Sequence, residues 1–240
     1  LSNGTVKHHM FLLLRLCHDF LSVEVAARTA HEATMGNHGQ CCSAGTRIFV
    51  QSPIYDKMVQ RLKELAEARK VGDPFAEDTV QGPQVDEVHF KRVMSYIESG
   101  KKEGARLVTG GARVGHKGYF IQPTVFADVT DEMTIAKEEI FGPVQSILRF
   151  DTFEEVVERA NATIYGSSGG VFTSDMDKAM RLAQAIEAGT FCINSYKCAA
   201  VQVPFGGYKM SGIGNELGEA GVESYLQTKV VTMPISQKNS

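Results

Sequence analysis

Several features that mark other classes of protein are missing from this sequence of 240 residues. It has no block of Lys and Arg, and a formal net charge of −3 with a pI near 6.2 gives no positive field for a nucleic acid backbone. The apolar run at residues 10–14 is broken by Arg15 and is too short to span a bilayer. We therefore expect neither nucleic acid nor a membrane as a partner.

The cysteines also lack the spacing of common metal and redox sites. There are five of them, an odd number, and no CxxC pair occurs. They are Cys17, Cys41, Cys42, Cys192 and Cys198. This pattern favours a reducing compartment, and we expect no metal ion because adjacent cysteines rarely ligate one tetrahedral ion without further ligands.

The remaining composition, 43% hydrophobic and 22% charged, is that of a globular protein large enough to bury a core. Amphipathic helical stretches alternate with short apolar stretches, and no internal repeat is present. The expected strands are residues 46–50, 106–109, 119–126, 145–150, 170–173 and 190–194. The expected helices lie between them. One of these helices ends at Gly100, and another begins with a capping box formed by Thr152 and Glu155. This order predicts an α/β fold with a mainly parallel sheet covered by helices on both faces.

A glycine-bounded stretch with two adjacent cysteines, residues 39–45 (GQCCSAG), precedes the first of these strands. A thiolate attacks carbonyl carbon readily, and converging backbone N–H groups in a turn lower the pKa of a thiol and hold the oxyanion formed by attack. Cys42 is therefore the candidate nucleophile. The alternative is that it is an inert, buried cysteine that serves packing alone.

Three motifs together resemble the signatures of the aldehyde dehydrogenases. Residues 37–42 (NHGQCC) resemble the signature around the nucleophile of that family, residues 137–144 (KEEIFGPV) its glutamate-containing cofactor motif, and residues 204–212 (PFGGYKMSG) its C-terminal signature. The resemblance covers residues 22–240, and the ending at 235–240 is most similar to the animal cytosolic, retinal-oxidising class and its mitochondrial relative. It implies the family's catalytic domain at 22–224, a C-terminal oligomerisation strand and tail at 225–240, and an unmatched segment at 1–21.

The resemblance also implies roles for particular residues. Cys42 would attack an aldehyde and pass through a thiohemiacetal and a thioester to a carboxylic acid, with Glu216 relaying protons. Glu139 would bind the ribose hydroxyls of the nicotinamide cofactor, NAD or NADP, and Phe141 would pack beside the nicotinamide. The substrate-binding side chains would be those of Cys41, Ser43 and Phe205. Without the motifs, Glu139 reads as a surface charge at a helix end, Glu216 as an acid at a helix start and Phe205 as a core aromatic.

Several family features have no counterpart in this sequence. These are the Gly-rich cofactor-binding half, the general-base glutamate, a cofactor-contacting lysine and the asparagine that supplies a second oxyanion donor; in addition, His89 stands where relatives often carry glutamine. We therefore expect a truncated NAD-dependent aldehyde dehydrogenase. The alternatives are an inactive fragment that binds full-length subunits and an NAD-independent thiol esterase. The family implies a homotetramer or hetero-oligomer in the cytoplasm, with the mitochondrial matrix as the other location.

Overall fold

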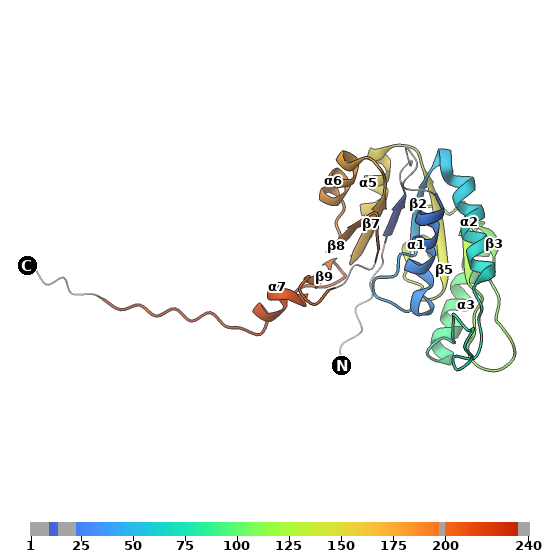
Figure 1. Ribbon diagram of the computed structural model, residues 1–240, viewed down its shortest axis with the longest axis horizontal. Coiled ribbons are helices and arrows are strands. Elements are labelled where there is room, and N and C mark those ends of the chain that lie inside the picture. Colours follow the sequence, from blue (N-terminus) through green and yellow to red (C-terminus); the bar gives the residue numbers. More distant parts are fainter. Residues whose placement is uncertain (1–9, 14–22, 197–199, 235–240) are drawn as a thin grey trace, which may run out of the picture.

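The computed structural model describes residues 10–13, 23–196 and 200–234, and Figure 1 shows the course of the chain. The helices are α1 (Val23–Met35), α2 (Tyr55–Ala68), α3 (Glu87–Lys102), α4 (Thr134–Lys137), α5 (Phe153–Asn161), α6 (Met176–Ala185) and α7 (Gly218–Glu223), with 3-10 turns η1 (Gly36–Gly39) and η2 (Ser52–Ile54). The main sheet contains β1 (Met10–Leu13), β2 (Arg47–Gln51), β3 (Arg106–Thr109), β4 (Thr124–Ala127), β5 (Val144–Phe150), β7 (Ser168–Phe172) and β8 (Thr190–Ile193).

The strands of this sheet lie in the order β3-β4-β5-β2-β1-β7-β8. Strand β3 pairs antiparallel with β4, and the other neighbours pair parallel. Parallel strands inside such a sheet are buried on both faces, as β7 is at all five residues and β2 at four of five. The expected mainly parallel α/β sheet is confirmed.

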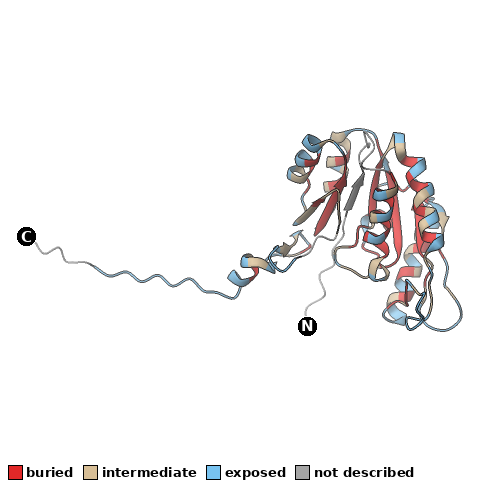
Figure 2. Ribbon diagram, in the orientation of Figure 1, coloured by how far each residue is buried: buried red, intermediate tan, exposed pale blue. Residues whose placement is uncertain are grey.

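Two apolar cores, one on each face of the sheet, follow from the alternation of side chains along the strands. In β2, Ile48 and Val50 pack with helices α1 and α2, whereas Phe49 packs with helices α3 to α6 on the opposite face. The same alternation places Ile147 and Leu148 of β5 in different cores. Figure 2 shows the buried strands between the inward faces of the helices.

Strand β1 is a difference from the sequence-based expectation, which set residues 1–21 apart from the domain. Its four residues lie between β2 and β7 and pair parallel with both, Met10 opposite Arg47 on one side and opposite Gly169 on the other. A run of four apolar residues is too short to cross a membrane but is long enough for a strand inside a parallel sheet.

The predicted helix ends are partly right. Thr152 and Glu155 form the expected capping box at the start of α5. The prediction that Gly100 ends α3 is wrong, because the helix continues to Lys102. Gly100 is buried, and an added Cβ would lie 3.0 Å from Ile135 and 3.1 Å from Phe126, so packing of α3 against the sheet accounts for this glycine.

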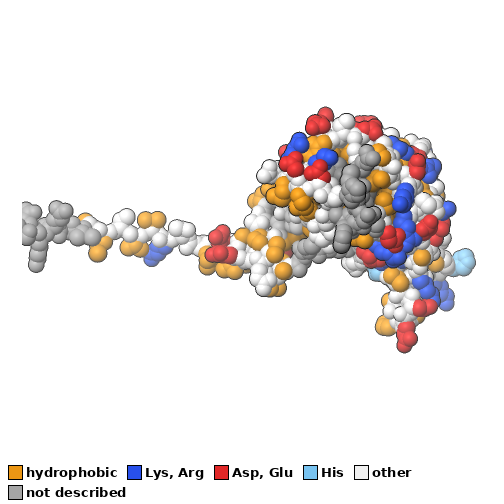
Figure 3. Space-filling view, turned by 45° about the horizontal axis from the view of Figure 1, so that its top comes forward, with side chains coloured by type: hydrophobic (Ala, Val, Ile, Leu, Met, Phe, Trp, Pro, Cys, Tyr) orange, Lys and Arg blue, Asp and Glu red, His pale blue; other side chains and the backbone are white. Residues whose placement is uncertain are grey.

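The C-terminal part follows the sheet as short two-residue strands and one short helix. β9 (Phe205–Gly206) pairs with β11 (Asn215–Glu216), and β10 (Tyr208–Lys209) pairs with β6 (Tyr165–Gly166). After α7, residues 225–234 extend away from the body and are exposed along their length (Figures 1 and 3). The expected oligomerisation strand at this position has no sheet partner among the described residues and stays a prediction.

Candidate active site

The turn that carries the cysteines follows helix α1 and has an unusual backbone. Asn37, His38 and Gly39 all adopt positive φ angles, 53°, 61° and 73°. Asparagine and glycine enter this left-handed region at low cost, whereas a histidine there costs about 1 kcal/mol. The Asn37 side chain stabilises the turn by donating a hydrogen bond from Nδ2 to the carbonyl oxygen of Gln40 at 2.7 Å.

Gly39 brings this turn into contact with the segment that carries the cofactor motif. A Cβ on Gly39 would lie 1.9 Å from the carbonyl oxygen of Gly142, which leaves no room for a side chain. The left-handed φ of Gly39 adds a second reason for glycine. Two motifs that are about a hundred residues apart along the chain therefore touch here through their backbones.

Cys42 lies at the surface of the turn, whereas Cys41 and Ser43 are half-buried. The Sγ of Cys41 lies 3.3 Å from the Oγ of Ser43, and the N–H of Ala44 donates to the carbonyl oxygen of Cys41 at 3.0 Å. The Ser167 hydroxyl donates to the carbonyl oxygen of Cys42 at 3.4 Å, which fixes the turn against the sheet. An exposed thiol on a braced turn can reach an electrophile from solvent.

Tyr196, just after β8, borders the same turn. A Cβ on Gly45 would lie 3.2 Å from its ring, and burial above all, followed by the charges of Cys192 and Cys41, raises the pKa of Tyr196. The tyrosine is therefore a neutral phenol beside the half-buried Cys41 at neutral pH.

The guanidinium of Arg69, the residue that follows α2, lies at the C-terminal end of α1 next to the turn. The Arg69 side chain donates to the carbonyl oxygen of Met35 at 3.3 Å and pairs with Glu32 at 2.7 Å, which suits the negative end of the helix dipole. Burial, assisted by Arg69, lowers the pKa of His31 to about 4 and holds the pKa of His38 below its usual value. Both histidines are therefore neutral at neutral pH.

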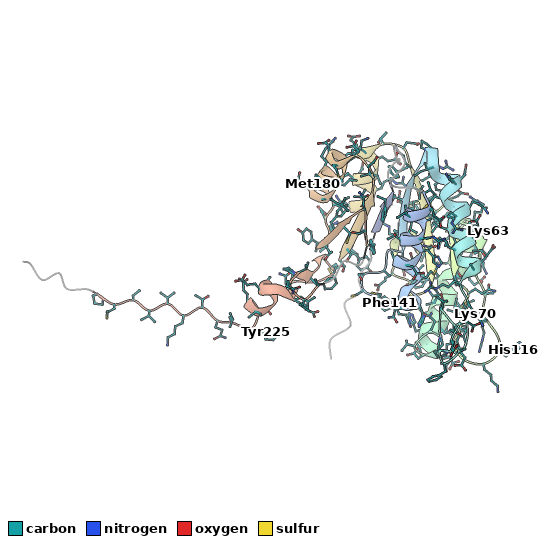
Figure 4. The ribbon with its side chains drawn as sticks, in the orientation of Figure 1. Lys63, Lys70, His116, Phe141, Met180 and Tyr225 are labelled. Carbon is teal, nitrogen blue, oxygen red and sulfur yellow. The ribbon has the colours of Figure 1, made fainter. Side chains whose placement is uncertain are left out.

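The segment after α4 carries Glu139 and Phe141. Glu139 is buried. Burial above all, and then the nearby charge of Glu139, raises the pKa of Tyr165 in β6. Phe141 is half-buried and left-handed, with φ 57°. Its carbonyl oxygen lies 2.7 Å from Nε2 of His89 (Figure 4 shows Phe141 below α1).

The segment that runs from β6 through Ser167 to β7 lies near both of these segments. The charge of Glu139 helps to raise the pKa of Tyr165 in β6, and Ser167, two residues later, donates a hydrogen bond to the carbonyl oxygen of Cys42. The structure thus brings the nucleophile candidate and the cofactor-motif residues to one region. The roles expected for Cys41, Cys42 and Ser43, and for Glu139 and Phe141, remain predictions.

Phe205 and Glu216 lie opposite each other in the β9–β11 pair. They share a hollow of about 260 Å³ that is lined by residues of the 205–224 region and does not include Cys42. Phe205 is half-buried and Glu216 is exposed. One residue that lines the hollow, Ser211, is bonded to β6, because its hydroxyl accepts a hydrogen bond from the N–H of Gly166 at 2.9 Å.

Sequence reasoning missed the residues that hold the two motifs in place. Gln84, His89 and Arg92 make hydrogen bonds to backbone atoms of the motifs, and Ser167 does the same from the sheet. The three-residue spacing of His89 and Arg92 on α3 was a usable signal, because such residues share one helical face. The sequence interpretation noted His89 only as a departure from relatives and assigned it no role.

Two other kinds of site find no support in the part of the chain that the structure describes. There, no three His, Cys, Asp or Glu side chains gather closely enough to hold a metal ion. None of the helices in the described ranges has the length and apolar character needed to cross a membrane.

Comparison with known proteins identifies close relatives. The model of the "Aldehyde dehydrogenase family" matches residues 16–231. Human "Aldehyde dehydrogenase, mitochondrial" is 57% identical over 215 residues, which are 90% of this chain and 42% of that protein. "Aldehyde dehydrogenase, cytosolic 2" of Macroscelides proboscideus is 53% identical over 215 residues, 90% of each chain.

Solved structures agree with these relatives. The NAD+ complex of aldehyde dehydrogenase from Bacillus cereus is 44% identical with a TM-score of 0.90, covering 97% of this chain and 46% of that one. Betaine aldehyde dehydrogenase from Staphylococcus aureus, in complex with NAD+, is 38% identical with a TM-score of 0.86. The chain thus spans less than half the length of the human and Bacillus proteins. The family resemblance drawn from the three motifs is confirmed.

Proposed function

Because the chain belongs to the aldehyde dehydrogenase family, we propose that it carries the nucleophile and the cofactor-side residues of an NAD-dependent aldehyde dehydrogenase. The reaction is the oxidation of an aldehyde to a carboxylic acid. The observation that carries this proposal is the exposed Cys42 on a strained turn that touches the Glu139–Phe141 segment through Gly39 and Gly142.

Cys42 performs the covalent part of the reaction. Its thiolate attacks the carbonyl carbon, and the resulting carbon–sulfur bond turns the carbonyl oxygen into an oxyanion, which the Cys42 backbone N–H stabilises. Loss of a hydride from the former aldehyde carbon leaves an acyl group on the sulfur. Water then attacks this thioester, the acid leaves, and the thiol is restored.

The residues of the cofactor motif fit the nicotinamide end of NAD. A bound nicotinamide supplies the acceptor for the hydride. An ionised Glu139 carboxylate would accept two hydrogen bonds from a vicinal diol, which is the task that the resemblance assigns to it. Two structural neighbours were solved with NAD+ bound, which supports the same cofactor here; NADP remains the other choice.

Phe205 and Glu216 supply the substrate passage and the proton relay in this proposal. A carboxylate relays protons best when it is partly shielded from water. Glu216 is exposed in the described part of the chain, so this role requires a further surface to cover the hollow beside β11. Glu216→Gln is then expected to slow thioester hydrolysis while Cys42 still becomes acylated.

The direct test is formation of reduced nicotinamide by the purified chain with NAD and a simple aldehyde. Cys42→Ala is the test variant, and Cys41→Ala is the matched control one residue away. Signal from the wild type and from Cys41→Ala that disappears in Cys42→Ala supports the proposal. Equal signal from Cys42→Ala, or none from the wild type, contradicts it. Hydrolysis of an activated ester that depends on Cys42 without nicotinamide reduction favours the thiol esterase instead.

A second candidate function, binding to other subunits, is favoured by the C-terminal segment. Tyr225, Val230, Val231 and Met233 are each more than three-quarters exposed, and the extended backbone of residues 225–234 offers unpaired edges to another sheet (Figures 3 and 4). Co-purification with a full-length aldehyde dehydrogenase that is lost when residues 225–240 are removed supports this role. Retention of the complex after that deletion contradicts it.

A further inference from the structure

One face of helix α3 follows the backbone that carries the cofactor motif. His89 lies with its Nε2 2.7 Å from the carbonyl oxygen of Phe141, and Arg92 donates from Nη2 to the carbonyl oxygen of Glu139 at 3.2 Å. The His89 ring also meets the Phe141 ring edge to face, with centroids 6.2 Å apart. His89 and Arg92 lie one helical turn apart, and they bond to the carbonyl groups of Phe141 and Glu139 in the same segment.

The same face continues one turn further along the helix. Tyr96 donates from its hydroxyl to Oε2 of Glu138 at 2.9 Å. Val93 packs so closely against Gly142 that an added Cβ on the glycine would lie 2.7 Å from its methyl groups. Positions 89, 92 and 96 share one side of a helix, so α3 contacts residues 138, 139, 141 and 142 of this segment.

The loop that precedes α3 holds the cysteine turn. Gln84 is buried and donates from Nε2 to the carbonyl oxygen of His38 at 3.4 Å. The backbone N–H of Val85 donates to Oε1 of Gln40 at 3.0 Å. These bonds support the left-handed part of the turn, where the backbone is strained.

A short, capped connection joins the two sets of contacts. Asp86 is the N-cap of α3, and its carboxylate accepts a hydrogen bond from the N–H of His89 at 2.7 Å. The loop residues at 84–85 are therefore rigidly linked to the first turn of the helix. Gly39 and Gly142 close the ring on the other side by direct backbone contact.

We propose that residues 84–92 are a positioning element that couples the Cys42 turn to the Glu139–Phe141 segment. The role of the two segments rests on the proposed function, but the coupling itself is a property of the bonds above. A carbonyl oxygen only accepts hydrogen bonds, so Nε2 of His89 is the donor to Phe141. The amide of a glutamine can supply the same donor.

The test perturbs one end and measures the other. His89→Leu removes the donor at the Phe141 end, and the rate of alkylation of Cys42 by iodoacetamide is followed by mass spectrometry of the Cys42 peptide. We expect the rate to fall by about threefold or more, because the turn that carries Cys42 loses the support that α3 gives it through the Phe141–Gly142 segment. His89→Gln is expected to restore the wild-type rate.

Lys91→Gln is the matched control, because its exposed side chain pairs with Glu87 on the outer face of the same helix. It should leave the rate unchanged. An unchanged rate in His89→Leu, or the same loss in His89→Gln as in His89→Leu, overturns the proposal. If His89→Leu fails to fold, Gln84→Met tests the coupling in the opposite direction, with faster hydrogen exchange expected in residues 138–142 and unchanged exchange refuting it.

Alkylation requires neither NAD nor an aldehyde. A failure of the coupling is therefore distinguishable from a failure of the proposed function, which is judged by reduced nicotinamide and by the Cys42→Ala variant.

Discussion

Acid should destabilise this protein through one histidine under the cysteine turn. His31 on α1 is 3% exposed, and its Nδ1 has no hydrogen-bond partner among the described residues. Burial above all, and the nearby Arg69, lower the pKa of its ring to about 4, whereas Glu32 acts weakly in the opposite direction. The folded protein therefore holds His31 neutral.

The size of the effect follows from the two pKa values. In the unfolded chain a histidine has a pKa of about 6.5, so the unfolded state binds the proton first as pH falls. The penalty is absent well above pH 6.5, grows as pH falls below about 6.5, and is complete below about 4. At full extent it amounts to about 3 kcal/mol of unfolding free energy, and at pH 4.5 to about 2.5 kcal/mol.

The assay is urea unfolding of the wild type and of His31→Gln at pH 7 and near pH 4.5. Glutamine does not titrate, and the carboxylates and other histidines are common to both proteins, so their contributions cancel in the comparison. The wild type should lose about 2 kcal/mol more stability than His31→Gln between these pH values. Equal losses in the two proteins would refute the argument that His31 is buried in its neutral form.

Three further substitutions have defined outcomes. Gly39→Ala should lower the melting temperature and slow alkylation of Cys42, because the added Cβ would displace the Gly142 carbonyl. Holding alanine at this left-handed φ costs about 1 kcal/mol more. An unchanged melting temperature with unchanged alkylation would contradict this. Tyr55→Phe should lower the unfolding free energy by about 2 kcal/mol in urea, because the N–H of Asp128 loses its 2.7 Å acceptor. Thr152→Ala should cost about 1 kcal/mol by the same measurement, through loss of the α5 cap.

The framework of the fold was predictable because its signals are local. Apolar runs at 46–50 and 145–150 correspond to β2 and β5, and the capping box at Thr152 marks the start of α5. Each of these depends on side-chain periodicity or on hydrogen bonds within one turn. The three motifs then pointed to the family, and the comparisons confirmed it.

Strand β1 was not predictable by the same means. The five apolar residues 10–14, bounded by residues without a clear helical or strand pattern, could belong to a strand, a short helix or a loop. Their place in the sheet depends on pairing with β2 and β7, which lie far along the chain. The prediction that Gly100 ends a helix was wrong for a related reason, because glycine is required there by close packing against Phe126.

The geometry of the cysteine turn shows why a motif alone does not make a nucleophile site. Asn37 and Gly39 favour a turn, and Asn37 bonds to Gln40 within the motif, but His38 adopts a left-handed backbone whose cost is offset in part from outside the motif. The offset comes from Gln84 and from contact with Gly142, which are distant in sequence and are themselves held by α3. The proposed coupling therefore predicts that substitution of His89 on α3 alters the reactivity of the Cys42 thiol without contacting it, whereas substitution of Lys91 on the outer face does not.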